Sequence, residues 1–281
     1  MYINTPFNYT GSKYKLLDQI LPNFDKTKKY FIDLFAGGGS IYTNVVDYYD
    51  KILVNDIITD LINIHKELLL NDNIISEVKK IVPNKNDKEA FLKLRKSYNE
   101  EKTAVKLWAL MLSSTNNMMR FNKQFQYNQT FGKRSFSDAT QKKIDIFTQH
   151  IRKYKDKIIF SSVEFYKIKP KQNTFIYIDP PYSHILNSDG TMGNKQISEA
   201  GYNNYFSKEH NIKLYEYIKI LNNSNNTFMI SGVLEHKGKK SWILTKLIEE
   251  GFNYKELTFD YTGVARRKNK YKTREIIITN Y

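Results

Sequence analysis

Three consecutive glycines between two short apolar segments constrain the fold of this chain more than any other feature. The apolar run Tyr30–Leu34 stops at Phe35–Ser40, which holds the glycines at positions 37–39. The following segment, Ile41–Tyr49, is predicted to be helical, and Ile52–Val54 is a second β-branched run that ends next to Asp56. Strand, glycine turn, helix, strand and acid in this order are typical of the start of a parallel α/β sheet.

Residues 57–155 differ from the rest of the chain because their apolar residues follow a helical period. Helices are expected at Ile58–Leu70, Asp87–Tyr98, Thr103–Leu112 and Ala139–Tyr154, and Ser113–Ser137 is expected to be a polar, basic loop. We therefore assign residues 1–56 and 156–281 to one α/β domain and residues 57–155 to a helical insert domain.

Strand signals return after the insert. Strands are expected at Lys157–Ser161, Thr174–Ile178 and Thr227–Ser231, helices at Ser207–Leu221 and near Lys239–Glu250, and a terminal hairpin from Tyr254–Tyr261 and Arg274–Thr279. The polar, glycine-containing stretch Ser183–Phe206 is expected to be a mobile loop. The predicted fold class is α/β: a mostly parallel twisted sheet flanked by helices, with a terminal hairpin and a helical insert domain.

Charge and cysteine content narrow the function classes. The chain has 44 Lys and Arg against 29 Asp and Glu, a net charge of +15. Such an excess favours a polyanionic partner, nucleic acid first, but on charge alone a solvated basic surface is an equal alternative. It has no cysteine, which excludes disulfides, thiolate metal sites and cysteine nucleophiles. No apolar run is long enough for a membrane helix and Met1–Leu21 carries no signal-peptide core, so we expect a cytoplasmic protein without a membrane partner.

The glycine segment and Asp56 suggest the class of cofactor. Glycines let the backbone approach a ligand closely, and an acid at the end of the next strand suits a ribose diol. The chain lacks both GxGxxG and GxxxxGK[ST] in this region, so dinucleotide and phosphate-loop sites are disfavoured. A ribose acid without phosphate-binding groups suits S-adenosylmethionine, although a glycine-rich turn without any ligand would have the same composition.

The tetrapeptide Asp179–Tyr182 follows an apolar strand and reads Asp-Pro-Pro-Tyr. Its two prolines fix the backbone and remove two N–H donors, which leaves carbonyl oxygens, a carboxylate and an aromatic ring. Such an acceptor-rich group suits an exocyclic amino group, and the tyrosine could stack on a base rotated out of a duplex. The alternative is a proline pair that only terminates the strand.

Taken in order, these motifs resemble the D12-type, Dam-like DNA adenine-N6 methyltransferases with the class alpha motif order. The similar motifs are residues 9–13 near the start, the glycine loop of residues 33–40, the acid at 56, the pair 164–165, and the tetrapeptide 179–182. The resemblance implies that S-adenosylmethionine, with S-adenosylhomocysteine as product and no metal, is held by Tyr9, Thr10, Gly11, Lys13, Asp33, Phe35, Ala36, Gly37, Gly38, Gly39, Ser40, Asp56, Ile57, Glu164, Phe165 and Asp179.

The resemblance also implies direct methyl transfer to N6 of an adenine flipped out of duplex DNA, with Asp179, Pro180, Pro181 and Tyr182 as the catalytic residues. Asp179 and the Pro180 carbonyl would accept the two amino hydrogens, and Tyr182 would stack on the base. Cytosine C5 methylation is excluded because its nucleophile is normally a cysteine, and cytosine N4 methylation ranks lower because it usually shows serine in place of Asp179.

The segment 120–134 interleaves amides, basic residues and aromatics, as base-reading loops do, although a solvated polar loop would look similar. It resembles the target-recognition loop of the GATC-methylating branch at Arg120, Asn122, Asn128, Phe131 and Gly132. It departs where that branch usually has glycine (Phe125) and proline (Thr130). Both positions lie in the base-reading region, so the resemblance leaves GATC and related short sites open. The DNA-binding residues expected are Arg120, Asn122, Gln124, Tyr127, Asn128, Lys133 and Arg134.

These inferences give a catalytic domain of residues 1–56 and 156–281 and a target-recognition insert of residues 57–155. The expected partners are double-stranded DNA and a cognate restriction endonuclease, in a bacterial or phage setting. The five histidines are scattered without ligand spacing, which predicts ordinary surface or helix histidines and no metal. The basic stretch 266–272 is a candidate phosphate contact. The rival functions are a methyltransferase for RNA or a small amine, and an inactive DNA-binding relative.

Overall fold

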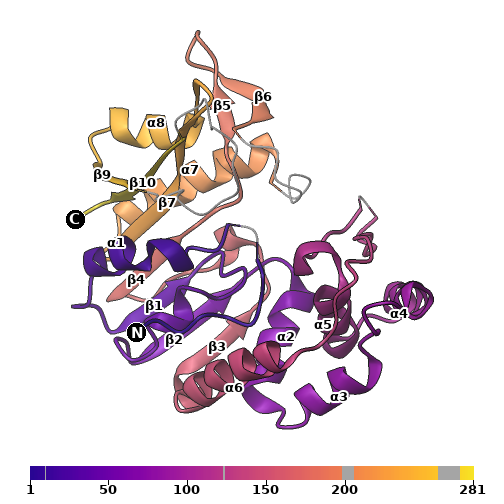
Figure 1. The fold of residues 1–281 in the computed structure, drawn as a ribbon. Coiled ribbons are helices and arrows are strands. Elements are labelled where there is room, and N and C mark those ends of the chain that lie inside the picture. The colour runs from indigo at the N-terminus through magenta and orange to yellow at the C-terminus, as the bar shows by residue number, and fades with distance from the viewer. Residues whose placement is uncertain (10, 123, 198–205, 259–272) are drawn as a thin grey trace. The chain divides into compact units, whose positions relative to one another are not determined.

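The computed structural model describes residues 1–9, 11–122, 124–197, 206–258 and 273–281. The chain divides into two compact units, of which unit 1 comprises Met1–Tyr14 and Ala36–Glu164 and unit 2 comprises Lys15–Phe35 and Phe165–Tyr281. Each unit combines strands with helices (Figure 1).

Unit 2 contains most of the strands. β1 (Tyr30–Asp33) runs parallel to β4 (Thr174–Ile178), and β4 runs parallel to β7 (Thr227–His236). β10 (Thr273–Thr279) then pairs antiparallel with both β7 and β9 (Asn253–Leu257). The predicted terminal hairpin is thus confirmed as the β9–β10 pair, while the basic stretch 266–272 lies outside the described residues. Every residue of β4 is buried, as expected for a central strand of an α/β sheet.

Unit 2 also contains helices and three shorter strands. They are α1 (Leu17–Ile20), β5 (His184–Leu186), β6 (Met192–Gln196), α7 (Lys208–Asn222), β8 (Lys239–Lys240), α8 (Trp242–Glu249), and 3₁₀ helices at Leu21–Asn23 and Phe165–Lys167. The helices predicted near α7 and α8 are confirmed. The core includes the packed rings of Phe24, Phe31 and Phe175.

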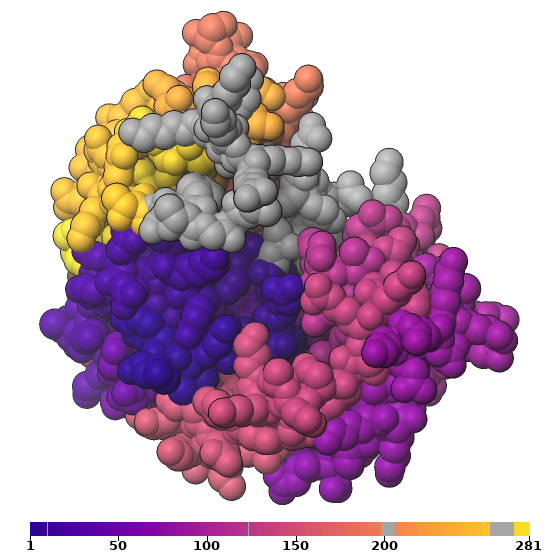
Figure 2. Space-filling view, viewed as in Figure 1, coloured from indigo at the N-terminus to yellow at the C-terminus, as the bar shows by residue number. Residues whose placement is uncertain are grey.

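The prediction of a loop over Ser183–Phe206 is wrong for its described first half. β5 and β6 pair antiparallel and project from the rest of unit 2 (Figures 1 and 2). Asp189 closes the turn by accepting hydrogen bonds from both the backbone N–H and the hydroxyl of Thr191. The hairpin escaped prediction because β6 is a polar strand, so its sequence lacks the apolar alternation that marks a half-buried strand.

Unit 1 pairs β2 (Lys51–Asn55) in parallel with β3 (Ile158–Ser161) and contains most of the helices. The helices are α2 (Thr59–Leu70), α3 (Ile74–Ile81), α4 (Lys88–Glu100), α5 (Ala104–Ser113) and α6 (Asp138–Arg152), with 3₁₀ helices at Tyr42–Asn44, Thr115–Asn117 and Lys155–Lys157. A further 3₁₀ helix, Tyr14–Leu16, lies where the two units meet in sequence. The four predicted helices are confirmed, and α3 was not predicted. The nearly apolar α5 is buried among α2, α3 and α4.

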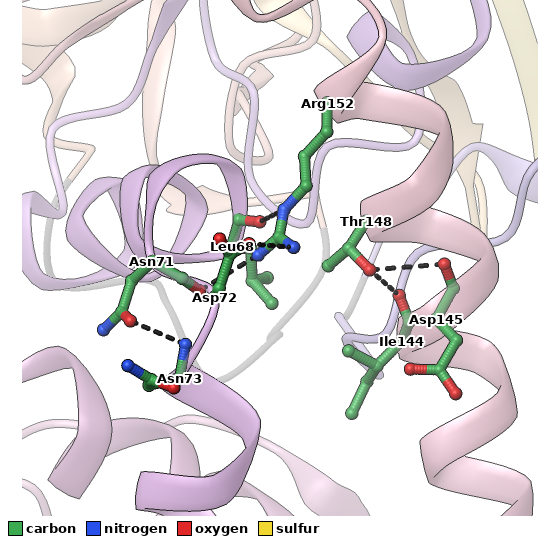
Figure 3. Close-up of polar contacts among 8 residues, drawn as sticks. All are labelled: Leu68, Asn71, Asp72, Asn73, Ile144, Asp145, Thr148 and Arg152. Carbon is green, nitrogen blue, oxygen red and sulfur yellow. Dashed lines mark hydrogen bonds and ion pairs between the residues drawn. The ribbon is translucent and has the colours of Figure 1, made fainter.

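Arg152 fastens the end of α6 to the end of α2 (Figure 3). Its guanidinium donates to the carbonyl oxygens of Leu68 (3.1 Å) and Asn71 (2.9 Å) and to the carboxylate of Asp72 (2.6 Å). These carbonyls end α2 and lack helical partners, so a cation there satisfies them and interacts favourably with the helix dipole.

The predicted helix Ile41–Tyr49 is wrong, because only the 3₁₀ turn Tyr42–Asn44 forms there. The hydroxyl of Thr43 donates to the Gly39 carbonyl (2.7 Å), and the amide of Asn44 donates to the Ser40 carbonyl (2.8 Å). Side chains of this kind compete with backbone donors for the same carbonyls and disfavour a regular helix.

The predicted fold class is confirmed: the main sheet is mixed and mostly parallel, is flanked by helices and ends in an antiparallel hairpin, while β5 and β6 form a separate pair. Within the described ranges, no helix has the length and apolar character needed to cross a membrane.

Candidate functional site

The glycine loop of unit 1 is shaped by Tyr9, whose ring lies directly against it. A Cβ added at Gly37 would lie 2.7 Å from Cε1 of Tyr9, and one added at Gly38 would lie 2.7 Å from its Cβ. Gly37 also has a positive φ of 48°, a conformation that L side chains rarely adopt. The structure therefore brings together two sets of predicted site residues that are distant in sequence, and explains why this contact needs glycine.

Asp56 braces the same loop. Its Oδ2 accepts a hydrogen bond from the backbone N–H of Gly37 (2.9 Å), and its Oδ1 accepts one from Ile58 (2.9 Å). The side chain is buried, and this burial raises its pKa above the ordinary value for aspartate. Each carboxylate oxygen has two acceptor positions, so Asp56 can hold the loop and still accept a ligand hydroxyl.

His65 on α2 is the functional candidate that the sequence reasoning missed. Its Nε2 lies 2.9 Å from the Gly37 carbonyl oxygen, and its Nδ1 lies 3.0 Å from the Tyr42 hydroxyl. Complete burial lowers its pKa from 6.5 to about 4, so the ring is neutral at physiological pH. In this setting Nε2–H donates to Gly37 and Nδ1 accepts from Tyr42, because a carbonyl oxygen can only accept.

Both polar backbone groups of Gly37 are therefore hydrogen-bonded: its N–H donates to Asp56, and its carbonyl accepts from His65. The prediction that the histidines are ordinary surface or helix residues missed this role. The available signal was position: Leu61, His65 and Leu68 follow the apolar repeat of α2, and all three are fully buried.

Lys13 and the other predicted cofactor residues of unit 1 differ in how far they are exposed. The buried ammonium of Lys13 donates to the Gly11 carbonyl (3.1 Å), and Gly11 has a φ of 84°. Ala36 and Ser40 are buried, Ile57 is exposed and Glu164 is half-buried. Thr10 lies outside the described residues.

In unit 2, two predicted acids stand at the carboxyl ends of neighbouring parallel strands. Asp33 ends β1, is buried, and is aligned with Tyr177 of β4, while Asp179 follows directly after β4. Ligands of open α/β sheets bind at this edge, beyond the carboxyl ends of the strands. Pro180, Pro181 and Tyr182 continue from Asp179 and are half-buried.

A hydrogen-bonded chain orients Asp179. Ser231 of β7 donates to Oδ1 of Asp179 (3.0 Å), and the Tyr177 hydroxyl lies 2.7 Å from the Ser231 hydroxyl. Burial and, secondarily, the negative charge of Asp179 raise the pKa of Tyr177, so its hydroxyl keeps its proton. Tyr177 therefore donates to Ser231, which donates to Asp179. Ser231 is a second site residue that the sequence reasoning did not select.

Phe35 and Phe165 lie in an aromatic cluster of unit 2. Their ring centroids are 5.3 Å apart, and Phe206 lies 6.0 Å from Phe35 and 6.2 Å from Phe165. Phe35 comes two residues after β1, so this cluster begins at the same edge of the sheet as Asp33. Such a cluster can contribute an apolar, aromatic wall to a site for a heterocyclic base.

In unit 1, the described residues 120–122 and 124–128 form a loop whose two sides are joined by a side-chain hydrogen bond and a backbone bridge. The Arg120 guanidinium donates to the carboxamide oxygen of Asn128 (2.9 Å), and the Phe121–Tyr127 pair forms an antiparallel bridge. Tyr127 is only 1% exposed, and Asn99 of α4 binds both its N–H (2.7 Å) and its carbonyl (3.2 Å). Tyr127, one of the predicted DNA-binding residues, is thus buried beneath the loop and anchors it to α4.

The other predicted DNA-binding residues of this segment are more accessible. Arg120, Gln124, Lys133 and Arg134 are exposed, while Asn122 and Asn128 are half-buried and bonded within the loop. In the described part of the chain, no group of three or more His, Asp or Glu side chains is placed to hold a metal ion.

The sequence is similar to those of known proteins. The family model of the D12 class N6 adenine-specific DNA methyltransferase matches residues 9–262. The chain is 30% identical over 291 residues to the Type II methyltransferase M.FokI of Planomicrobium okeanokoites, covering 100% of this chain and 43% of that protein. It is 24% identical over 286 residues to the Type II methyltransferase M1.LlaDCHI of Lactococcus lactis subsp. cremoris, covering 98% and 95%.

A DNA adenine methylase of Vibrio cholerae is also similar, with 27% identity over 183 residues that cover 63% of this chain and 64% of that protein. The chain spans less than half the length of M.FokI but nearly the whole of M1.LlaDCHI.

Proposed function

Because this chain belongs to the D12 class of N6 adenine-specific DNA methyltransferases, we propose that it transfers a methyl group from S-adenosylmethionine to N6 of adenine at a short site in duplex DNA. The observation that carries this proposal is the acceptor group at the end of β4, where Ser231 orients Asp179 ahead of two prolines. A pair of acceptors on a rigid backbone suits an amino group that must donate two hydrogen bonds while its nitrogen reacts.

The residues around the glycine loop fit S-adenosylmethionine. Gly37 and Gly38 let the Tyr9 side chain lie directly against the loop, and Asp56 has acceptor positions left for the ribose hydroxyls. Phe35 and Phe165 are the aromatic residues proposed to pack against the adenine ring of S-adenosylmethionine. When bound, S-adenosylmethionine supplies a methyl group already activated by its sulfonium, so this chain needs neither a nucleophilic side chain nor a covalent intermediate.

We propose that the protein's residues act mainly by positioning and electrostatics. The lone pair of adenine N6 is delocalised into the ring, which makes this nitrogen a poor nucleophile. Asp179 and the Pro180 carbonyl accept its two hydrogens and localise that lone pair, while Tyr182 stacks on the flipped base. N6 would then form its bond to the methyl carbon as the carbon–sulfur bond breaks, S-adenosylhomocysteine would leave, and one amino proton would pass to water.

DNA recognition is assigned to the helical segment of residues 57–155, with segment 120–134 as the reading loop. Its exposed Arg120, Gln124, Lys133 and Arg134 supply two kinds of contact, base edges and phosphates. The target is GATC or a related short site. Phe125 and Thr130 are the positions at which the loop sequence differs from that of the GATC-methylating branch. By analogy with the modification methylases it resembles, the protein acts on bacterial or phage DNA in the cytoplasm, alongside a cognate endonuclease.

The test is to identify the modified base. The protein is incubated with unmethylated genomic DNA and labelled S-adenosylmethionine, the DNA is digested, and the nucleosides are separated by mass. N6-methyladenine confined to one short sequence is the expected result. N4-methylcytosine would contradict the assigned base. Parallel incubations replace the DNA with total RNA or with small amines, and label there but not in the DNA would contradict the DNA substrate.

A further inference from the structure

Strand β7 extends beyond the edge of the sheet at which Asp179 lies. β4 ends at Ile178, whose partner on the parallel β7 is Ile230, and the next residue of β7, Ser231, bonds to Asp179. β7 continues from there to His236. At about 3.3 Å a residue, its end lies up to about 17 Å beyond Ser231, on the side of the sheet where ligands bind.

Four exposed residues, Lys237, Gly238, Lys239 and Lys240, join the end of β7 to β8, and we call them the basic turn. The first two have φ of 53° and 74°, as the central residues of a type I′ turn require. Asparagine followed by glycine is the usual sequence there, because lysine is strained in a left-handed conformation. Strain of this kind in an exposed turn points to a use for the charge that it carries.

The register of the strands places neutral groups beside Lys239. Lys239 is aligned with His236 of β7, and His236 is aligned with Thr273 of β10, whose hydroxyl lies 2.8 Å from Nδ1 of His236. Burial and, secondarily, the charges of Lys237 and Lys239 lower the pKa of His236, so its ring is neutral at physiological pH. The ammonium group of Lys239 therefore extends from a face formed by a neutral ring and a hydroxyl.

The acid nearest to the basic turn in the register is already ion-paired. Glu235, which is aligned with Lys240, lies 3.5 Å from the Arg274 guanidinium, and Arg274 also pairs with Glu256. Glu275 lies further from the turn, beyond the irregularity that follows Arg274 in β10. The basic turn thus presents three cations beside an acid that a fourth cation shares, and such a cluster favours an anionic partner.

We propose that the basic turn, through Lys239, contacts the phosphate backbone of the duplex at one side of the target adenine. Lysine holds phosphates without reading the base sequence. The duplex rises about 3.4 Å per base pair, so 17 Å corresponds to about five base pairs between the target and this contact. The inference rests on the proposed methylation of duplex DNA and deepens it, because it adds a phosphate contact on unit 2 to the reading loop of unit 1.

The test compares Lys239→Gln and Lys239→Arg with the wild-type protein in binding to three labelled duplexes that carry the methylated site. One duplex has about ten base pairs on each side of the target adenine, and each of the others has one flank cut to about two. We expect Lys239→Gln to bind the long duplex about threefold more weakly, and its slope of log affinity against log salt to be smaller by about 1. Lys239→Arg keeps the charge and should bind like the wild type.

The shortened duplexes test where the contact lies. The wild type and Lys239→Gln should bind one of them equally, because that duplex lacks the contacted phosphates, and should still differ on the other. Lys29→Gln is the matched control, since Lys29 is exposed just before β1, at the opposite edge of the same parallel strands. It should leave affinity and salt slope unchanged, and both glutamine variants should melt at the wild-type temperature.

The outcomes separate this inference from the proposed function. Wild-type affinity and salt slope in Lys239→Gln on the long duplex would overturn the phosphate contact alone. Equal weakening on all three duplexes would overturn its place in the flanking DNA. A wild-type protein that binds none of the duplexes would overturn the proposed function as well.

Discussion

His65 should make folding stability depend on pH in a way that a substitution can remove. Burial lowers its pKa from 6.5 to about 4 in the folded chain, whereas the unfolded chain keeps the ordinary value. Below pH 6.5 the unfolded state therefore binds a proton that the folded state does not, and stability falls as the pH falls. Each pH unit in this window corresponds to about 1.4 kcal/mol, so this one group removes about 2 kcal/mol between pH 7 and pH 5.

The assay is urea unfolding at pH 7, 6 and 5. His65→Gln keeps a side-chain N–H that can donate to the Gly37 carbonyl but cannot be protonated, so the variant should lose about 2 kcal/mol less than the wild type on acidification. Other titrating groups are common to both proteins and cancel in this comparison. His150→Gln, at a half-buried position of α6, is the matched control for replacing a helix histidine by glutamine. Parallel losses in His65→Gln and the wild type would refute the reasoning.

Three further predictions concern the sites themselves. Asp56→Ala should weaken binding of S-adenosylmethionine at least tenfold, since it removes the ribose acceptor and the brace on Gly37, and calorimetry would show this; unchanged affinity would contradict the assignment. Ser231→Ala should lower the single-turnover methylation rate about tenfold while DNA affinity stays constant, because it loosens the orientation of Asp179; a change in DNA affinity alone would be the wrong outcome. Lys133→Gln should weaken binding of all duplexes equally and reduce the slope of log affinity against log salt by about 1, so selective loss on one sequence would make Lys133 a base reader.

The sequence predicted the elements whose signals are local. β4 was found because a five-residue apolar run ends abruptly at Asp179, and α2, α4, α5 and α6 because their apolar positions follow a helical period. The β5–β6 hairpin and the short α3 were missed because a polar strand and an eight-residue helix carry weak periodic signals. The helix predicted after the glycines failed because Thr43 and Asn44 bond to backbone carbonyls instead.

The sequence predicted the motif residues of the candidate site but not the residues that bond to them. The glycines, Asp56 and Asp179 stand in motifs with fixed spacing, so the sequence alone could single them out. His65 and Ser231 act by bonding to those residues from α2 and β7, and such contacts depend on tertiary packing that spacing does not encode. Tyr127 shows the converse, because an aromatic in a base-reading pattern turned out to be buried under the loop.

The most direct test of the central claim is the single-turnover rate of methyl transfer to duplex DNA by Asp179→Ala, measured together with its DNA affinity. The account predicts that transfer becomes undetectable while DNA binding stays largely intact, because Asp179 accepts an N6 hydrogen but holds no phosphate. Normal transfer with weakened DNA binding would contradict the role assigned to the acid at the end of β4.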